Sequence, residues 1–136
     1  MRIYKTLHIG DFHTNNCEDF LVEEQIATSE KLVAVLDGCT MGKESVFASM
    51  LYGKILRSIS KKEYYKEFVS SQTIDLKTKL KEVVKQLIEE TKAIKNKLDL
   101  ETNELLATLI IGIVNTNEFK AEFLVVGDGL ICIDEK

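Results

Sequence analysis

Three acidic positions in this 136-residue chain carry the side chains needed to hold a metal ion. They are the adjacent pair Glu18–Asp19, Asp37 followed by Gly38, and Asp128. Each lies in or next to apolar sequence at an expected strand end or turn, and a buried carboxylate must be paired or bound to a cation. Carboxylates, together with backbone carbonyls and waters, are the ligands that Mg²⁺ and Mn²⁺ prefer. These positions therefore predict a divalent-metal site if the fold brings them together.

Asp37 is the most informative of these acids because it ends an apolar run, in "VAVLDGCTMGKESVFAS" over residues 33–49. It could serve as a metal ligand, as a nucleophile or simply as a turn residue. Gly38 has no Cβ, so its backbone could approach an ion closely. However, Asp-Gly is also a common turn pair, and Asp128 in "VVGDGL" is equally typical of a turn between strands. Spacing alone leaves these alternatives open.

Two familiar phosphate-chemistry motifs fail in this segment. A P-loop needs four residues between its glycines and a Ser or Thr after the lysine. Gly38 and Gly42 are one residue too close, and Glu44 follows Lys43. The D-x-D-G-T loop of haloacid-dehalogenase-like phosphatases would place its nucleophile at Val35, which has no nucleophilic group.

The pattern of apolar residues predicts an α+β fold with antiparallel sheets and helices on one face. "KLVAVL" is apolar throughout, as in a strand buried on both faces, and the 3.6-residue period is clearest over 74–98. Residues 60–72 are polar and predict a helix end and a loop, and "TNEF" at 116–119 predicts a hairpin. The expected elements are strands over about 3–9, 18–25 and 31–36, helices over 42–59 and 74–98, and strands over 106–115, 120–128 and from 129 onward.

Composition limits the classes of function. A length of 136 residues fits a single domain over 1–136, and the net charge of −4 gives no indication of a nucleic-acid partner. The longest apolar stretch, at 105–114, is too short to cross a bilayer, and the amino terminus lacks the apolar core of a signal peptide. We therefore expect a cytoplasmic protein with no membrane partner.

The three cysteines, Cys17, Cys39 and Cys132, are widely separated and odd in number. This argues against a disulfide framework, and the absence of a C-x-x-C pair argues against a zinc site. Cys39 is close enough to Asp37 to be considered as a nucleophile, although a small buried thiol is the more ordinary interpretation.

Four segments, in order along the chain, resemble motifs of the metal-dependent protein phosphatases of the type 2C family. "NNCEDF" resembles the R-x-x-N-E-D motif, and "VAVLDGCTMGKESVFAS" resembles the D-G-H-G-G segment with the helix after it. "LLATLIIGIV" resembles the G-T-T strand, with Thr108 at its second threonine, and "FLVVGDGLICI" resembles the G-D-S-R strand and turn. The resemblance implies a β-sandwich of two antiparallel sheets flanked by helices, apparently truncated at the carboxy terminus.

The resemblance also implies roles for the acidic residues. Asp37 would bridge two Mn²⁺ or Mg²⁺ ions, Gly38 would offer its carbonyl, and Glu18 and Asp19 would hold the ions or their waters. Asp128 would serve a third, weaker ion. Asp37, Glu18 and Asp19 would then be the catalytic set of a serine/threonine phosphatase, in which a metal-activated water attacks the phosphorus of a phosphoserine or phosphothreonine protein.

Several positions depart from the family pattern. The phosphate-binding arginine is replaced by Thr14, with His13 beside it as a partial substitute. Cys39 takes the place of the histidine in D-G-H, and Gly129 and Leu130 replace the last two residues of G-D-S-R. These departures indicate a divergent branch of bacterial type, with His13 and Thr14 on the substrate side.

The family's later metal-binding aspartates, in D-G and D-N motifs, have no counterpart before Lys136. We therefore expect the chain to be the amino-terminal part of such a domain, with an exposed sheet edge that favours a homodimer. Three hypotheses remain: a metal-dependent phosphatase, a non-catalytic phosphatase-like binding or regulatory module, and an unrelated α+β interaction domain whose acids are turn residues.

Overall fold

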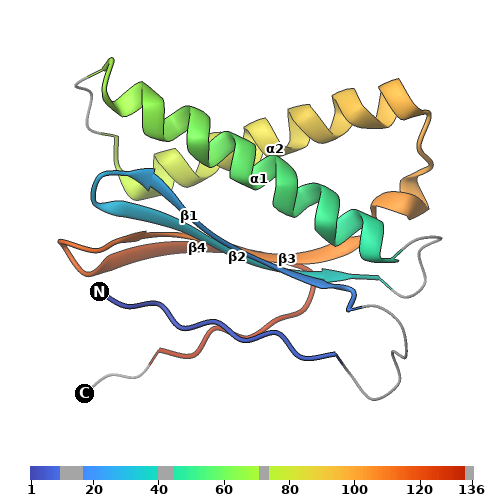
Figure 1. Ribbon diagram of the computed structural model, residues 1–136, viewed down its shortest axis with the longest axis horizontal. Coiled ribbons are helices and arrows are strands. Elements are labelled where there is room, and N and C mark those ends of the chain that lie inside the picture. Colours follow the sequence, from blue (N-terminus) through green and yellow to red (C-terminus); the bar gives the residue numbers. More distant parts are fainter. Residues whose placement is uncertain (10–16, 40–44, 71–73, 134–136) are drawn as a thin grey trace.

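The fold is α+β, with one four-stranded antiparallel sheet and two long helices on one of its faces (Figure 1). The computed structural model describes residues 1–9, 17–39, 45–70 and 74–133. Neighbouring strands in the sheet follow chain order, β1-β2-β3-β4. The elements are β1 (Asp19–Ala27), β2 (Glu30–Gly38), α1 (Ser45–Glu67), α2 (Leu76–Leu98), a 3₁₀ turn η1 (Thr102–Leu105), β3 (Ala107–Asn115) and β4 (Lys120–Val126).

The core lies between the sheet and the helices. Alternate residues of β2 turn toward the helices, and of these Leu32 and Leu36 are fully buried. Leu56 and Ile59 of α1 and Val83 of α2 are buried with them. Burying each large apolar side chain contributes about 1.5–3 kcal/mol, so this layer accounts for most of the packing that holds the helices on the sheet.

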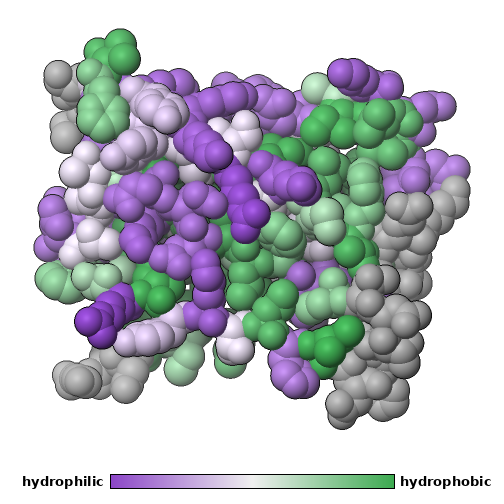
Figure 2. Space-filling view, in the orientation of Figure 1, coloured by the Kyte–Doolittle hydropathy of each residue, from purple (hydrophilic) through white to green (hydrophobic). Residues whose placement is uncertain are grey.

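Helix α2 matches its predicted extent because both ends carry capping residues. The Asp75 side chain accepts a hydrogen bond from the Thr78 backbone N–H at 3.0 Å, and Asp99 adopts the left-handed conformation that ends the helix. Its outward side chains include the exposed Lys77, Lys81 and Glu89. On the face of the molecule seen in Figure 2, on which α1 lies in front of α2, hydrophilic side chains are likewise exposed, together with hydrophobic ones.

Helix α1 extends to Glu67, so the stretch 60–72, predicted to be a helix end and a loop, begins with more helix than its polar sequence suggested. The polar side chains of this last stretch have partners on neighbouring elements. Glu67 accepts hydrogen bonds from the backbone N–H and the hydroxyl of Thr28, at 2.7 and 2.8 Å. Glu63 accepts a hydrogen bond from Gln86 of α2 at 3.0 Å. These tertiary contacts favour helix where the sequence shows no apolar period.

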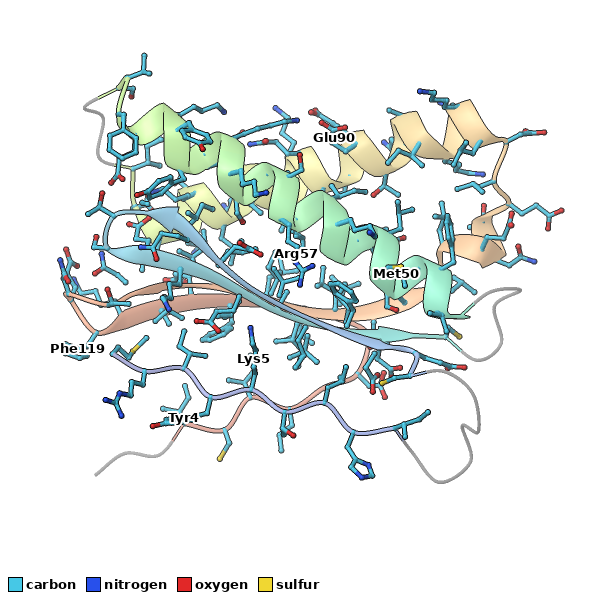
Figure 3. The ribbon with its side chains drawn as sticks, in the orientation of Figure 1. Tyr4, Lys5, Met50, Arg57, Glu90 and Phe119 are labelled. Carbon is cyan, nitrogen blue, oxygen red and sulfur yellow. The ribbon has the colours of Figure 1, made fainter. Side chains whose placement is uncertain are left out.

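The outer face of the sheet, on the side away from the helices, is covered by irregular chain. Residues 1–9 and 129–133 run beneath it (Figure 1), and neither segment forms a strand, so both strand predictions are wrong. Lys5 points toward the sheet and Tyr4 away from it (Figure 3). Lys5 makes an ion pair with Glu23 of β1 at 3.3 Å, and Tyr4 is exposed. The amino-terminal segment therefore crosses the face instead of extending the sheet.

The prediction that β2 is buried on both faces is wrong for the outer face. Val35 remains 48% exposed, because the covering segment shields this face only in part. A shallow cavity of about 280 Å³ separates the amino-terminal residues from an apolar patch that includes Val35, Ile110 and Phe123. Within the described residues the sheet is single, so a second sheet is not seen.

Candidate functional site

The predicted acidic residues gather at one end of the sheet, on its outer face. Asp19 and Asp37 are directly opposite each other in the β1–β2 ladder, and Asp37 is also opposite Thr108 of β3. The ladder continues one step further, because the Gly38 backbone N–H donates to the Glu18 carbonyl at 3.1 Å. Three strands therefore bring these residues together.

Asp128 reaches the same place through the turn after β4. Gly127 has a positive φ of 90°, which favours glycine. A Cβ at this position would lie 2.7 Å from Cγ2 of Thr108, so the backbone also approaches Thr108 too closely for any other residue. The turn thereby directs the chain toward Thr108, and Asp128 is near enough to affect the charge of Asp37.

A cavity of about 470 Å³ unites these positions. The described residues that line it include neither lysine nor arginine, although His8 is present. They are His8, Ile9, Cys17, Glu18, Asp19, Asp37, Gly38, Cys39, Thr108 and Asp128.

The electrostatic environment of Asp37 is unfavourable to its charge. Partial desolvation raises the pKa of the Asp37 carboxyl above its ordinary value, and a hydrogen bond with Asp19 raises it further. The negative charges of Asp19, Asp128 and Glu18 act in the same direction. A carboxylate surrounded by other carboxylates is a place where a cation would relieve repulsion.

Helix α1 fixes the backbone at this end of the sheet. The Ser49 hydroxyl donates to the carbonyl of Glu18, and the Tyr52 hydroxyl donates to the carbonyl of Leu105 at 2.6 Å. Burial raises the pKa of Tyr52, so its phenol stays protonated and able to donate. The segments that lead into β1 and β3, the two strands that flank Asp37, are therefore anchored to the same helix.

Close packing strengthens this anchorage at β1. A Cβ on Gly53 of α1 would lie only 2.2 Å from Cδ1 of Phe20, so the helix approaches the strand through the glycine. Arg57 stacks over the Phe20 ring, with 4.9 Å from its guanidinium carbon to the ring centroid. Phe20 follows Asp19 directly, and its packing therefore holds the strand that carries this carboxylate.

The acidic residues are less buried than the sequence predicts. Asp37 and Asp128 are exposed, whereas Glu18 and Asp19 are half-buried. The apolar residues next to Asp37 face the helices, and the strand alternation turns its own side chain outward. His13 and Thr14, predicted on the substrate side, lie outside the described residues.

Sequence reasoning missed two residues of the cavity wall that carry polar side chains, His8 and Cys17. Cys17 could have been found from its spacing, because residues two apart in an extended chain project to the same side. Its Sγ lies 3.7 Å from Oδ2 of Asp19 and is placed to donate a weak hydrogen bond. His8 comes from the irregular amino-terminal segment and has no comparable signal.

The donor chemistry fits a hard divalent cation, since carboxylates and carbonyls predominate. The spacing fits less well. Among the residues that the structure describes, no three His, Cys, Asp or Glu side chains are placed to hold one ion together. Asp19 and Asp37 are opposite each other in the ladder, and a hydrogen bond between their side chains contributes to the raised pKa of Asp37.

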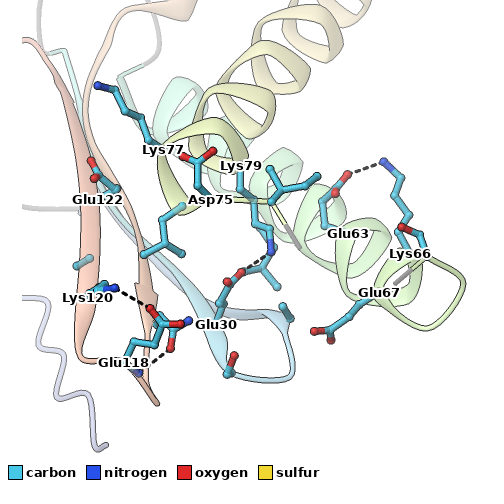
Figure 4. Close-up of a pocket in the computed structure, with 18 of the residues that line it drawn as sticks. Glu30, Glu63, Lys66, Glu67, Asp75, Lys77, Lys79, Glu118, Lys120 and Glu122 are labelled. Carbon is cyan, nitrogen blue, oxygen red and sulfur yellow. Dashed lines mark hydrogen bonds and ion pairs between the residues drawn. The ribbon is translucent and has the colours of Figure 1, made fainter. Parts of the chain in front are cut away.

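A larger cavity, of about 1140 Å³, lies at the opposite end of the strands (Figure 4). Its charged residues are mixed in sign and several are already paired. Lys79 is paired with Glu30, Lys66 with Glu63 at 2.6 Å, and Lys120 with Glu118 at 3.0 Å. This cavity therefore offers no concentrated charge to select a ligand, and the acidic cavity is the stronger candidate site.

Comparison with known proteins identifies the family. The family model described as protein phosphatase 2C matches residues 9–136, which is nearly the whole chain. No curated protein and no solved structure matches it. In the described part of the chain, no helix has both the length and the apolar character needed to cross a bilayer. The match and the placement of the acidic motifs agree, and the chain belongs to the protein phosphatase 2C family.

Proposed function

We propose that this protein is a metal-dependent serine/threonine phosphatase that hydrolyses phosphomonoesters on proteins. The observation that carries the proposal is the meeting of Asp19, Asp37 and Thr108 across three strands, with Glu18 and Asp128 on the same cavity. Family membership supports phosphatase chemistry. The raised pKa of Asp37 supports a cation at this place, because a positive charge would offset the neighbouring carboxylates.

Within this proposal each residue has a distinct task. Asp37 would hold Mn²⁺ or Mg²⁺ ions together with the carbonyl oxygen of Gly38. Glu18 and Asp19 would hold the ions or the waters around them, and Asp128 would serve a third ion. When bound, such ions supply charge stabilisation and an activated water. The strands and α1 contribute the rigid spacing that keeps these ligands in position.

Other features belong to the same proposal. His13 and Thr14 contact the phosphate of the phosphoserine or phosphothreonine substrate. The apolar outer face is one inner surface of the two-sheet sandwich typical of the family, which agrees with the exposure of Val35. Residues 1–136 form one domain of a divergent, bacterial-type and cytoplasmic enzyme that has no nucleic-acid or membrane partner. An exposed sheet edge favours a homodimer.

A non-catalytic phosphatase-like binding or regulatory module is the second candidate. The observation in its favour is that no three potential ligands in the described residues are placed around one ion. A module of this kind would keep the fold and the acidic cavity without a complete metal site. It predicts no metal-dependent hydrolysis and no specific effect of Asp37 on metal binding.

The test is hydrolysis of p-nitrophenyl phosphate by this chain with and without Mn²⁺, together with thermal unfolding at the same concentrations. Wild type, Asp37→Asn and Asp99→Asn are compared, because Asp99 caps α2 outside the lining of the acidic cavity, in a conformation that asparagine tolerates.

A phosphatase should show Mn²⁺-dependent activity that Asp37→Asn removes and Asp99→Asn retains. Specific binding should also raise the melting temperature of wild type and Asp99→Asn, because a ligand of the native state stabilises it. Absence of activity, together with melting temperatures that Mn²⁺ leaves unchanged in each of the three proteins, would favour the non-catalytic module.

A further inference from the structure

Two cysteines, Cys17 and Cys39, line the acidic cavity where the β1–β2 ladder ends. Asp19 pairs with Asp37, and the Gly38 N–H to Glu18 carbonyl bond of 3.1 Å carries the β1–β2 ladder one residue further. The next step in this antiparallel register places Cys17 opposite Cys39. β2 also continues as extended chain at this point, because the Cys39 N–H donates to the carbonyl of Leu106 at 3.1 Å.

The hydrogen-bond pattern shows which kind of pair the two cysteines form. Hydrogen-bonded and non-hydrogen-bonded pairs alternate along an antiparallel ladder. Because Gly38 bonds directly to Glu18 opposite, the pairs on either side are of the non-hydrogen-bonded kind. In such pairs the Cα atoms are about 4.5 Å apart, which is within the range of about 4.4–6.8 Å found for disulfides.

The side chains also project to the same side. Cys17 Sγ lies 3.7 Å from Asp19 Oδ2, so it shares the outer face with that carboxylate. Cys39 is two residues from Asp37 and lines the same cavity of about 470 Å³. Both thiols are free and half-buried, whereas Cys132 is exposed and does not line this cavity. Reagents can therefore reach the pair through the cavity.

We propose that Cys17 and Cys39 are a redox-active pair that forms a reversible cross-strand disulfide when a small-molecule disulfide is the oxidant. The bond would join the positions two residues away from Asp19 and Asp37, and would thus tie the ends of the two strands that carry these carboxylates. The proposal depends on the sheet register and not on phosphatase activity, so the result of the hydrolysis assay does not affect it.

The reaction is a balanced thiol–disulfide exchange. The thiolate of one cysteine attacks a sulfur of the small-molecule disulfide, and the first thiol leaves. The second cysteine then attacks the protein sulfur of this mixed disulfide, which releases the second thiol. The two protons of the protein thiols end on the two released thiols. The protein is oxidised by two electrons, and the small disulfide is reduced by two.

The test uses the Cys132→Ser chain, which retains only the two cysteines of interest. Folded protein is incubated with oxidised glutathione, free thiols are alkylated, and the intact mass and proteolytic peptides are measured. We expect a monomer that has lost two hydrogens, carries no alkyl group and yields a peptide linking Cys17 to Cys39. Dithiothreitol should restore both thiols, and subsequent alkylation should label both.

Three outcomes would overturn the proposal: two thiols still free for alkylation, stable glutathione adducts on the cysteines, or disulfides between chains. A matched denatured sample controls for the fold. The intramolecular bond should form at least tenfold faster in the folded chain, because the register holds the thiols together, and equal rates would contradict the geometry. Cys17→Ser and Cys39→Ser variants in the Cys132→Ser background should each retain one thiol that alkylates or adds glutathione.

Discussion

Glu30 and Asp37 sit at opposite ends of the same strand, β2, and their carboxylates meet different surroundings. Glu30 is 8% exposed and forms an ion pair with Lys79 of α2 (Figure 4). Asp37 is exposed, yet its neighbours are the acids Asp19, Asp128 and Glu18, and together with partial desolvation they raise its pKa. At the Glu30 end the protein supplies its own cation. At the Asp37 end the described wall contains no lysine or arginine, as expected of a site adapted to receive one.

The largest effect should come from removing the cation at the Glu30 end. Lys79→Met keeps the aliphatic volume but leaves the buried Glu30 carboxylate without its partner. Removing one partner of a buried ion pair lowers the free energy of unfolding by about 3–5 kcal/mol. We expect a loss near the lower value, because both side chains of this pair retain some contact with solvent. Chemical denaturation measures the change.

Lys77→Met is the matched control, because Lys77 is exposed on the same turn of α2. It should change the free energy of unfolding by less than about 0.5 kcal/mol. If both variants lose equally little stability, the Glu30–Lys79 ion pair does not stabilise the fold, and the contrast with the Asp37 end is not supported.

A smaller effect is expected from the packing that positions the acidic end. In Gly53→Ala the new methyl group would overlap the Phe20 ring, which must shift. Overpacking of this kind costs about 1–3 kcal/mol. The loss of stability should be accompanied by a weaker response to Mn²⁺, because Phe20 adjoins Asp19. Both quantities can be followed by thermal unfolding with and without the ion.

Phe20→Leu provides the control, since a smaller side chain leaves room for the methyl group. The double variant Phe20→Leu/Gly53→Ala should be less destabilised than the sum of its single variants. Additive losses would mean that the ring and the helix glycine are not coupled, contrary to the close approach in the structure.

The acidic end was also the more predictable of the two from sequence. Asp37 and Asp128 were recognisable because each ends an apolar segment, and the antiparallel order β2-β3-β4 then brings both to the same end of the sheet. The pairing of Glu30 with Lys79 has no such signal, because 49 residues separate them and helix α2 must first dock on the sheet. Exposure of Asp37 was also not predictable, because it depends on what covers the outer face.

Elements were predictable where local periodicity decides them, and less so where tertiary contacts do. α2 shows a clear 3.6-residue period and has a capping aspartate at its start. The last turns of α1 show neither, and they form because Glu63 and Glu67 find partners on α2 and after β1. Residues 3–9 have strand-like composition but cross the outer face, where Lys5 is held by Glu23.

The smallest effect concerns the charge of Asp37 in metal-free buffer. A raised pKa in the folded state means that folding favours the protonated carboxyl, so this contribution to stability is full at low pH. It is lost as the pH rises through the raised pKa, and ionised Asp37 then opposes folding. Asp37→Asn carries no charge and should therefore melt at a higher temperature than wild type at pH 7. The difference should shrink below the ordinary aspartate value of 3.8. Asp99→Asn should show no such pH-dependent gain, and a gain of equal size there would mean that net charge, not the acidic cavity, causes it.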